Sequence, residues 1–241
     1  MYMDSRAEII VVHSSDLHLG IDDSFDPERT FRSLSVLQDV LTAASAVRAD
    51  VVVLAGDTFD NHRQPTKLLE LASDILRDYA RPVVILPGNH DPLTPDSVYR
   101  RAGLASIPNV SILGLNVDGG VQFSELELEV WGRAHVDYLD MAPLANPRPR
   151  STRWQLAAAH GHYVDQARDP NRLIGSWLIY PEEIAATAAD YLALGHWNQS
   201  TAVGNGQVIA HYSGSPEYTG TVNVVELNRD GTVVVGKAAL R

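Results

Sequence analysis

The sequence contains no cysteine. Disulfide bonds, zinc sites built on thiolates and cysteine nucleophiles are therefore all excluded. Any metal ion must bind through imidazole, carboxylate or amide groups, because these are the ligand side chains that remain. The composition is compatible with a reducing compartment.

Positive charge is also scarce. The chain has 19 Lys and Arg residues against 30 Asp and Glu residues, which gives a formal net charge of -11. Broad nucleic-acid-binding surfaces draw most of their affinity from neutralising phosphates. This balance therefore argues against a free-standing protein with a broadly basic binding face, and contact with DNA would need local positive charge or bound metal ions.

No hydrophobic run approaches the ~18 residues of a membrane-spanning helix. Residues 1–8 carry Asp4, Arg6 and Glu8 before a short apolar run. We expect a cytoplasmic protein that does not enter a membrane. The 241 residues with 45% hydrophobic content are enough for one well-filled core, so we also expect a single domain over residues 1–241.

Short apolar runs alternate with helical patterns in the first part of the chain. Runs rich in β-branched residues predict buried strands, and apolar residues at three- and four-residue spacing predict helices. The expected elements are strands at 8–14, 50–55 and 82–86 and helices at 27–47 and 65–79. This alternation favours right-handed parallel crossover units.

After Pro92 the strands become shorter, and we expect a second sheet to begin there. The expected elements are strands at 110–113, 121–123, 125–131, 154–159, 191–194, 208–212, 221–227 and 232–238, and a helix at 181–188. We expect the last three strands to be hairpin-like, with a tight turn at 228–231. Residues 143–153 are rich in Pro and Arg and indicate a surface loop, with a basic edge facing a substrate as the alternative. The predicted fold is α/β, with two packed sheets and helices outside.

Six short segments place oxygen or imidazole groups just after predicted strands. They are Asp16-Leu17-His18, Gly56-Asp57, Gly88-Asn89-His90-Asp91, His160-Gly161-His162, Gly195-His196-Trp197-Asn198 and Tyr212-Ser213-Gly214-Ser215-Pro216. In an extended backbone, side chains two residues apart turn to the same side, so an Asp-x-His pair can chelate one ion. The ordered set predicts a two-metal phosphoesterase site at strand ends, where open α/β sheets bind ligands.

Each segment also has a simpler interpretation. Asp57 could sit in an ordinary strand-to-loop turn, and an isolated Asp-x-His is often a turn with a solvated ring. His160 and His162 flank Gly161, and strand alternation lets only one of them face the edge where the other ligands gather. We prefer His160, and we interpret His196 as a ligand rather than a core histidine.

The strings SSDLHLG, LAGDTFD, LPGNHD, LALGHWN and YSGSPEYTG resemble the calcineurin-like metallophosphoesterase superfamily. Within it, they are most similar to the branch of SbcD-type DNA repair exonucleases. The resemblance runs from about Val11 to Thr219. It implies a two-sheet β-sandwich flanked by helices, with the metal site at the carboxyl ends of the strands.

The resemblance also implies a set of metal ligands. One metal would be held by Asp16, His18 and Asp57, and a second by Asp57, Asn89, His160 and His196. Asp57 would bridge the two ions. The family normally has a further histidine where this chain has Asn198, which would complete the first site. An amide oxygen is a weaker donor than imidazole, so the first site would bind its ion less tightly or prefer a harder ion.

Two cations about 3.5–4 Å apart can each bind a phosphate oxygen, generate hydroxide near neutral pH and stabilise in-line displacement. No protein nucleophile is then needed. His90 is the candidate general acid that protonates the leaving oxygen. By resemblance, Asp60 would orient His90, with a plain surface carboxylate as the alternative. Manganese is the ion that the family suggests, and iron, zinc or magnesium also fits these ligands.

We therefore expect a metal-dependent phosphodiesterase or nuclease that acts on DNA or another nucleotide diester. The enzyme alternative is a small phosphomonoesterase or cyclic-nucleotide phosphodiesterase. The last predicted strand ends close to Arg241, so we expect the capping and partner-binding segments of repair nucleases to be missing, with a separate ATPase or capping chain as the partner. A hypothesis of another class is a non-catalytic metal-binding scaffold whose site is degenerate at Asn198. Metal stoichiometry separates the two classes.

Overall fold

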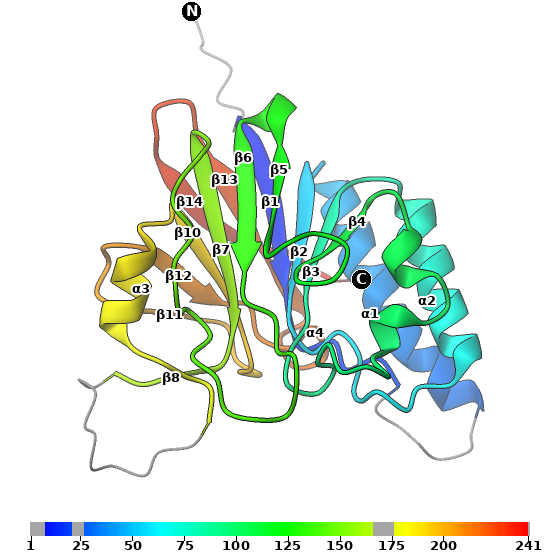
Figure 1. Cartoon of the computed structure of the whole chain (residues 1–241). Coiled ribbons are helices and arrows are strands. Elements are labelled where there is room, and N and C mark those ends of the chain that lie inside the picture. The colour runs from blue at the N-terminus through cyan, green and yellow to red at the C-terminus, as the bar shows by residue number, and fades with distance from the viewer. Residues whose placement is uncertain (1–7, 21–26, 166–175, 241) are drawn as a thin grey trace, which may run out of the picture.

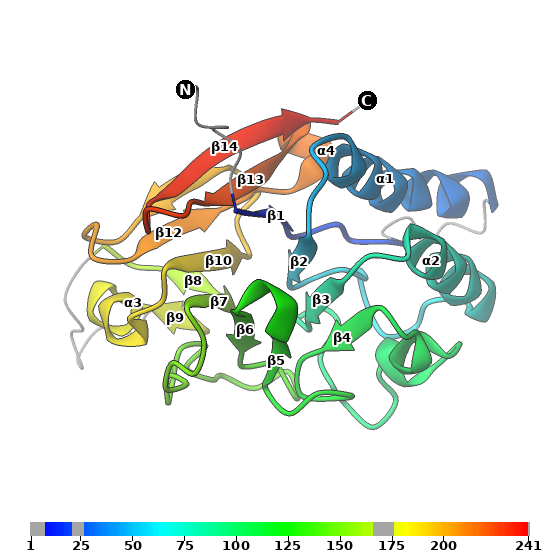
Figure 2. The same cartoon turned by 90° about the horizontal axis from the view of Figure 1, so that it is seen from above.

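The computed structural model describes residues 8–20, 27–165 and 176–240. These residues form two six-stranded sheets that face each other, with helices on their outer sides (Figures 1 and 2). Helices α1 (Pro27–Ala46) and α2 (Thr66–Tyr79) flank the first sheet, and α3 (Pro181–Thr187) lies beside the second (Figure 2). The predicted α/β fold of two packed sheets with helices outside is confirmed.

The first sheet has the strand order β14-β13-β1-β2-β3-β4. Its strands are β1 (Ile9–Ser14), β2 (Val51–Ala55), β3 (Val83–Leu86), β4 (Val110–Ile112), β13 (Thr221–Leu227) and β14 (Val233–Ala239). Strands β1 to β4 are parallel, as the alternating pattern predicts. Strands β13 and β14 form an antiparallel hairpin that extends the sheet beside β1.

The second sheet has the order β11-β12-β10-β7-β6-β5. Its strands are β5 (Gly120–Phe123), β6 (Leu128–Gly132), β7 (Trp154–His160), β10 (Tyr191–Gly195), β11 (Thr201–Val203) and β12 (Ile209–Tyr212). Strands β6, β7, β10 and β12 are mutually parallel, with antiparallel strands at both edges. A separate parallel pair, β8 (His162–Tyr163) and β9 (Leu178–Ile179), follows β7.

The core lies between the two sheets and beneath the helices. Every residue of β2, β7 and β10 is buried, and β2 contacts both β7 and β10 across the sandwich. Strands covered on both faces read as continuous apolar runs, which explains why the sequence pattern located these central strands. None of the described helices is both long enough and apolar enough to cross a membrane.

Three predicted placements are wrong. Residues 110–113 do not begin the second sheet, because β4 pairs in parallel with β3 of the first. Residues 208–212 do not join the last hairpin, because β12 pairs with β10 and β11 in the second sheet. The strand expected at 125–131 begins only at Leu128, after a 3-10 turn over Ser124–Leu126. A short apolar run does not indicate which sheet it joins, because any sheet edge offers the same backbone hydrogen bonds.

The shortest elements were not predicted. They are β8, β9, β11, α4 (Pro216–Thr219) and the 3-10 helices Val98–Arg100, Leu104–Ser106 and Ser124–Leu126. None of them is longer than four residues, and such segments are too short to show a hydrophobic period.

Candidate metal centre

Loops from both sheets bring six of the predicted ligands together. They are Asp16, His18, Asp57, Asn89, His160 and His196, and each follows or ends a strand of the sandwich. Among the described residues, Asp16, His18 and Asp57 can each offer one ligand atom within 4.8 Å of the others. The same holds for Asp57, His160 and His196. Asp57 is therefore shared by two of the three candidate metal groups of the described residues, the third being His18, Asp60 and His90.

The second group is centred on the buried ring of His160. Its Nδ1 donates a hydrogen bond to the Ala55 carbonyl oxygen at 2.9 Å, which directs Nε2 toward the site. Nε2 lies 3.0 Å from Asp57 Oδ2 and 3.0 Å from Asn89 Oδ1. His196 Nδ1 lies 3.2 Å from the same Asn89 oxygen. Four donor atoms thus converge from four different loops.

The first group is built on Asp16 and His18. The buried Asp16 carboxylate accepts a 2.5 Å hydrogen bond from Ser15 Oγ and a 2.9 Å bond from the backbone N–H of His196. Ser15 Oγ also lies 2.9 Å from Ser213 Oγ, which brings the YSGSP segment behind this group. His18 Nε2 points toward Asp57, 3.9 Å from Oδ2.

The electrostatics of the cluster suit a cation. Burial alone would raise the pKa of Asp57, but the charge and hydrogen bond of His160 hold it well below its usual value. Burial opposes the charged form of His160, yet Asp57 raises the pKa of His160 to about 9. Burial lowers the pKa of His196 to about 4, so this ring is neutral and able to ligate. The donor set of oxygen and nitrogen atoms therefore fits divalent ions, whose charge would replace the proton on His160.

Four of the six ligands have backbone φ angles that side chains rarely adopt. The φ angles are 55° for Asp16, 46° for His18, 50° for Asp57 and 106° for His196. Such conformations cost on the order of 1–3 kcal/mol each and persist where the surrounding structure enforces them. The surrounding structure therefore enforces the backbone conformation of four predicted ligands.

Two glycines allow the loops to approach His160 closely. A Cβ atom at Gly56, whose φ is +93°, would lie 2.0 Å from His160 Nδ1. A Cβ atom at Gly195 would lie 1.9 Å from the Ala55 carbonyl oxygen. Neither contact is sterically allowed, so glycine is required where β2 and β10 end against the histidine.

Asp60 contacts His90, but the hydrogen bond runs through its main-chain carbonyl, and its role in orienting His90 remains a prediction. The Asp60 carboxylate lies on His18, with Oδ1 3.1 Å from Nδ1. His90 Nδ1 instead donates to the main-chain carbonyl of Asp60 at 2.9 Å. The rings of His18 and His90 meet edge to face, with centroids 4.8 Å apart. Asp60 therefore contacts both histidines, and sequence reasoning could not tell its side chain from its carbonyl.

The sequence left open whether His160 or His162 is the ligand and whether Asn198 takes part, and these residues lie in different environments. His160 is buried in the cluster, whereas His162 is exposed and its Nδ1 accepts a 3.0 Å hydrogen bond from Trp197 Nε1. Asn198 lies in the loop after β10 and is exposed, unlike the six clustered ligands, of which His18 and His196 are half-buried and the others buried. The ligand role of Asn198 remains a prediction.

Sequence reasoning missed the role of Asp91. This fully buried carboxylate accepts hydrogen bonds from the backbone of Gly88 at 2.7 Å and Phe59 at 2.9 Å, and from the Tyr99 hydroxyl at 2.5 Å. Burial and then the charge of Asp57 raise its pKa to about 6. Asp91 thus ties the loop after β2 to the loop after β3. The only sequence signal for this role was a carboxylate in a tight turn with apolar residues on both sides.

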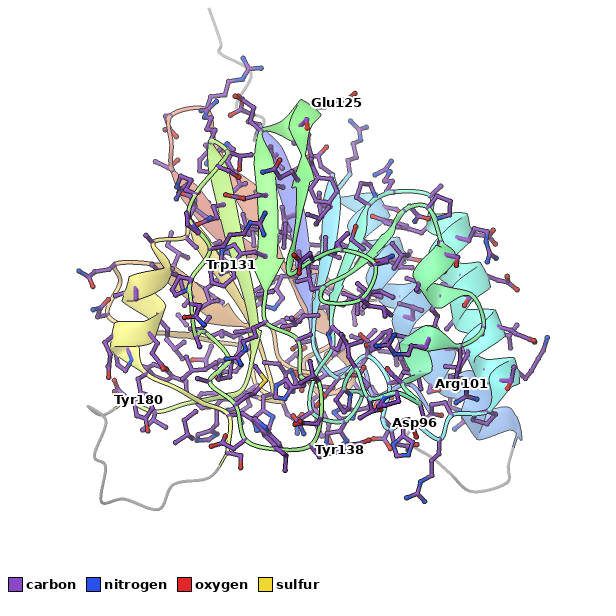
Figure 3. All side chains as sticks on the ribbon, viewed as in Figure 1. Asp96, Arg101, Glu125, Trp131, Tyr138 and Tyr180 are labelled. Atoms are coloured by element: carbon purple, nitrogen blue, oxygen red, sulfur yellow. The ribbon has the colours of Figure 1, made fainter. Side chains whose placement is uncertain are left out.

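A pocket of about 600 Å³ opens beside the cluster. Its lining residues are Asp60, Asn61, His62, Arg63, Asn89, His90, Tyr138 and Trp177. The β6 arrow of Figure 1 points toward the lower end of the molecule, and Figure 3 shows Tyr138 and Asp96 near that end. The exposed ring of His90 is part of the lining, so a bound molecule can reach both His90 and the ligand Asn89.

Comparison with known proteins gives a consistent result. The family model for calcineurin-like phosphoesterases matches residues 9–201. The SbcD component of the nuclease SbcCD from Bacillus subtilis (strain 168) is 26% identical over 243 residues, which cover 86% of this chain and 61% of that protein. The DNA double-strand break repair protein Mre11 from Saccharolobus solfataricus is 28% identical over 222 residues, with 86% and 54% covered. The chain thus spans less than two thirds of the length of these relatives.

A solved structure shows the same fold. The dimetal phosphatase from Danio rerio superposes with a TM-score of 0.58 at 14% identity, covering 98% of this chain and 100% of that chain.

Proposed function

This chain belongs to the calcineurin-like phosphoesterase family, and from that premise we propose that it is a phosphodiesterase that uses two divalent metal ions. The observation that carries the proposal is the shared position of Asp57 between two candidate metal groups. His90 lies beside them on the wall of an open pocket. A pair of ions with a neighbouring imidazole suits phosphate-ester hydrolysis, and a scaffold would not need the imidazole.

The residues would divide the work as follows. Asp16, His18 and Asp57 would hold one ion, and Asp57, Asn89, His160 and His196 would hold the other. When bound, the ions supply an activated water and neutralise phosphate charge. In its imidazolium form, which carries a proton on both nitrogens, His90 would donate the Nε2 proton to the leaving oxygen and keep its Nδ1 proton on the Asp60 carbonyl.

Specificity for a diester is part of the proposal. Two relatives that match 86% of the chain are named as part of a nuclease and as a DNA repair protein. We infer a nucleotide diester as the substrate class and manganese as the ion, with action on DNA ends and an ATPase or capping partner as extensions of the same hypothesis. A phosphomonoesterase is the second candidate, because the dimetal phosphatase shares the fold.

Hydrolysis of two chromogenic esters tests the proposal. Metal-stripped protein refilled with manganese should hydrolyse bis(p-nitrophenyl) phosphate faster than p-nitrophenyl phosphate and should bind close to two ions per chain. A chelator should abolish both reactions, because removing the ions removes the activated water that attacks the phosphate. Preference for the monoester would favour the phosphatase. Two bound ions without any turnover would favour the scaffold.

Replacing Asp60 with asparagine should weaken one metal site and spare the other. The Asp60 carboxylate accepts a hydrogen bond from His18 Nδ1, which fixes Nε2 toward Asp57. Removing such an outer carboxylate typically lowers metal affinity by about 10–100-fold. Calorimetric titration of the Asp60→Asn variant with manganese should therefore resolve one unchanged and one weakened binding event.

The matched control is Asp74→Asn on α2, where the carboxylate pairs with Arg77 on the exposed surface. This control should bind both ions as the unmodified protein does. Unchanged affinity at both sites in Asp60→Asn would show that the contact with His18 does not support metal binding.

A further inference from the structure

An exposed aromatic side chain stands on the wall of the pocket. Tyr138 lies in the loop after β6, and its side chain is 50% exposed although it is one of the largest apolar groups. It lines the same pocket as His90 and Asn89. Its neighbours Val136 and Leu139 are exposed as well, and covering such apolar groups with a ligand would be favourable.

The ring is held in position from its hydroxyl end. Tyr138 Oη forms a 2.6 Å hydrogen bond with His62 Nδ1, and His62 Nε2 lies 3.7 Å from Asp96. Partial burial and then the charge of Asp96 raise the pKa of Tyr138 above its usual value. The rings of Tyr138 and His62 are tilted by 58° with centroids 6.1 Å apart, so His62 does not stack on the tyrosine face.

The supports of the ring are themselves fixed. Arg101 donates from its guanidinium to the carbonyls of His62 at 3.1 Å and Gln64 at 2.9 Å. Leu139, the residue after Tyr138, is also held, because its carbonyl accepts a 3.0 Å hydrogen bond from Trp177 Nε1. Figure 3 shows Arg101, Asp96 and Tyr138 near the same end of the molecule. A ring ordered in advance loses little entropy when a ligand packs on it.

The pocket offers the other groups that a nucleotide needs. Its volume of about 600 Å³ lies in the range of small-molecule sites. Arg63 is exposed and lines it, and a guanidinium suits a phosphate oxygen. Flat bases stack on aromatic side chains irrespective of sequence, with a loss of about 1–3 kcal/mol per base when the ring is removed.

Building on the proposed phosphodiesterase function, we propose that Tyr138 is the stacking platform for the base of the nucleoside whose phosphate enters the site. The recognised ligand is thus a nucleoside ester rather than an alkyl ester. A short nucleotide end fits better than a long duplex, because the formal charge of -11 opposes broad contact with a phosphate backbone.

The test compares two esters that release the same product. The p-nitrophenyl ester of thymidine 5'-phosphate carries a base, and methyl p-nitrophenyl phosphate does not. In the manganese-loaded protein, Tyr138→Ala should lower kcat/KM for the thymidine ester roughly tenfold, mainly through KM, and leave the methyl ester unchanged. Tyr138→Phe keeps the ring and should retain most of the preference for the thymidine ester. Metal content should be the same in all three proteins.

The outcomes separate the base-stacking role of Tyr138 from the phosphodiesterase function. An equal loss on both esters, or no loss on either, would overturn the base-stacking role while leaving the hydrolytic activity intact. A loss in Tyr138→Phe as large as in Tyr138→Ala would also overturn it, since the hydroxyl and not the ring would then matter. Failure of the unmodified protein to hydrolyse either ester would overturn the phosphodiesterase function itself and the subsite with it.

Discussion

Replacing His90 with glutamine is expected to lower turnover by about 10²–10⁴-fold while two ions remain bound, because a general acid contributes a factor of this size. The imidazole is exposed on the pocket wall, and its Nδ1 bond to the Asp60 carbonyl leaves Nε2 for the substrate. Glutamine can hydrogen-bond to a phosphate but cannot release a proton near neutral pH. The measurement is kcat on bis(p-nitrophenyl) phosphate together with metal content.

The role of His90 predicts a dependence on the leaving group. An ester whose leaving group is a good one, such as p-nitrophenolate, needs little protonation, and an alkoxide leaving group needs much more. The loss in His90→Gln should therefore be larger for a dinucleotide than for the nitrophenyl ester. His162→Gln is the matched control, since that exposed ring lies outside the candidate metal groups of the described residues. A fully active His90→Gln variant would remove His90 from the mechanism.

Replacing Asp57 with asparagine is expected to reduce both metal sites at once and to bring turnover to background. Asp57 Oδ2 lies 3.0 Å from His160 Nε2 and 3.9 Å from His18 Nε2, so one carboxylate serves both groups. Its Oδ1 also accepts the backbone N–H of His90 at 2.9 Å. An amide cannot supply the negative charge that both ions require.

The measurement is the number of ions per chain after dialysis, with titration calorimetry for affinity. Stoichiometry should fall from near two to below one. Asp50→Asn is the control, because Asp50 lies at the opposite end of β2 and its carboxylate accepts the Ile10 N–H at 2.8 Å. That variant should keep both ions. Two tightly bound ions in Asp57→Asn would show that another group bridges them.

The two substitutions separate binding from chemistry. Loss of turnover with metal retained in His90→Gln, combined with loss of metal in Asp57→Asn, is expected only for a metal-dependent hydrolase. A scaffold would lose ions in Asp57→Asn but would have no turnover for His90 to affect. The pair therefore decides between the enzyme and the non-catalytic alternative more directly than either variant alone.

The sequence located the central strands and the ligand segments for local physical reasons. β2 and β10 are continuous apolar runs because both of their faces are buried, and a glycine followed by a ligand stands at the end of each. Parallel strands bring their carboxyl ends to one edge of a sheet, so the placement of Asp57 and His196 at strand ends was predictable. Their convergence was not, because β2 and β10 belong to different sheets. The family resemblance of the motifs is confirmed by the match over residues 9–201.

Only the tertiary structure decided which groups touch. It placed His160 rather than His162 against Asn89, and it put the Asp60 carboxylate on His18 while the Asp60 carbonyl meets His90. These contacts join segments up to 71 residues apart, and local backbone preferences carry no information about such pairs.

The contact between Tyr138 and His62 on the pocket wall lay beyond sequence reasoning for the same reason. Tyr138 and His62 meet across 76 residues, and neither stands in a motif that the ligand pattern required. The sequence by itself determined which polar side chains stand at the end of each central strand, because residue type and hydrophobic periodicity can be read from neighbouring residues. The tertiary structure decided their partners, since the sheet pairing and the loops from two sheets fix distances that no local pattern encodes.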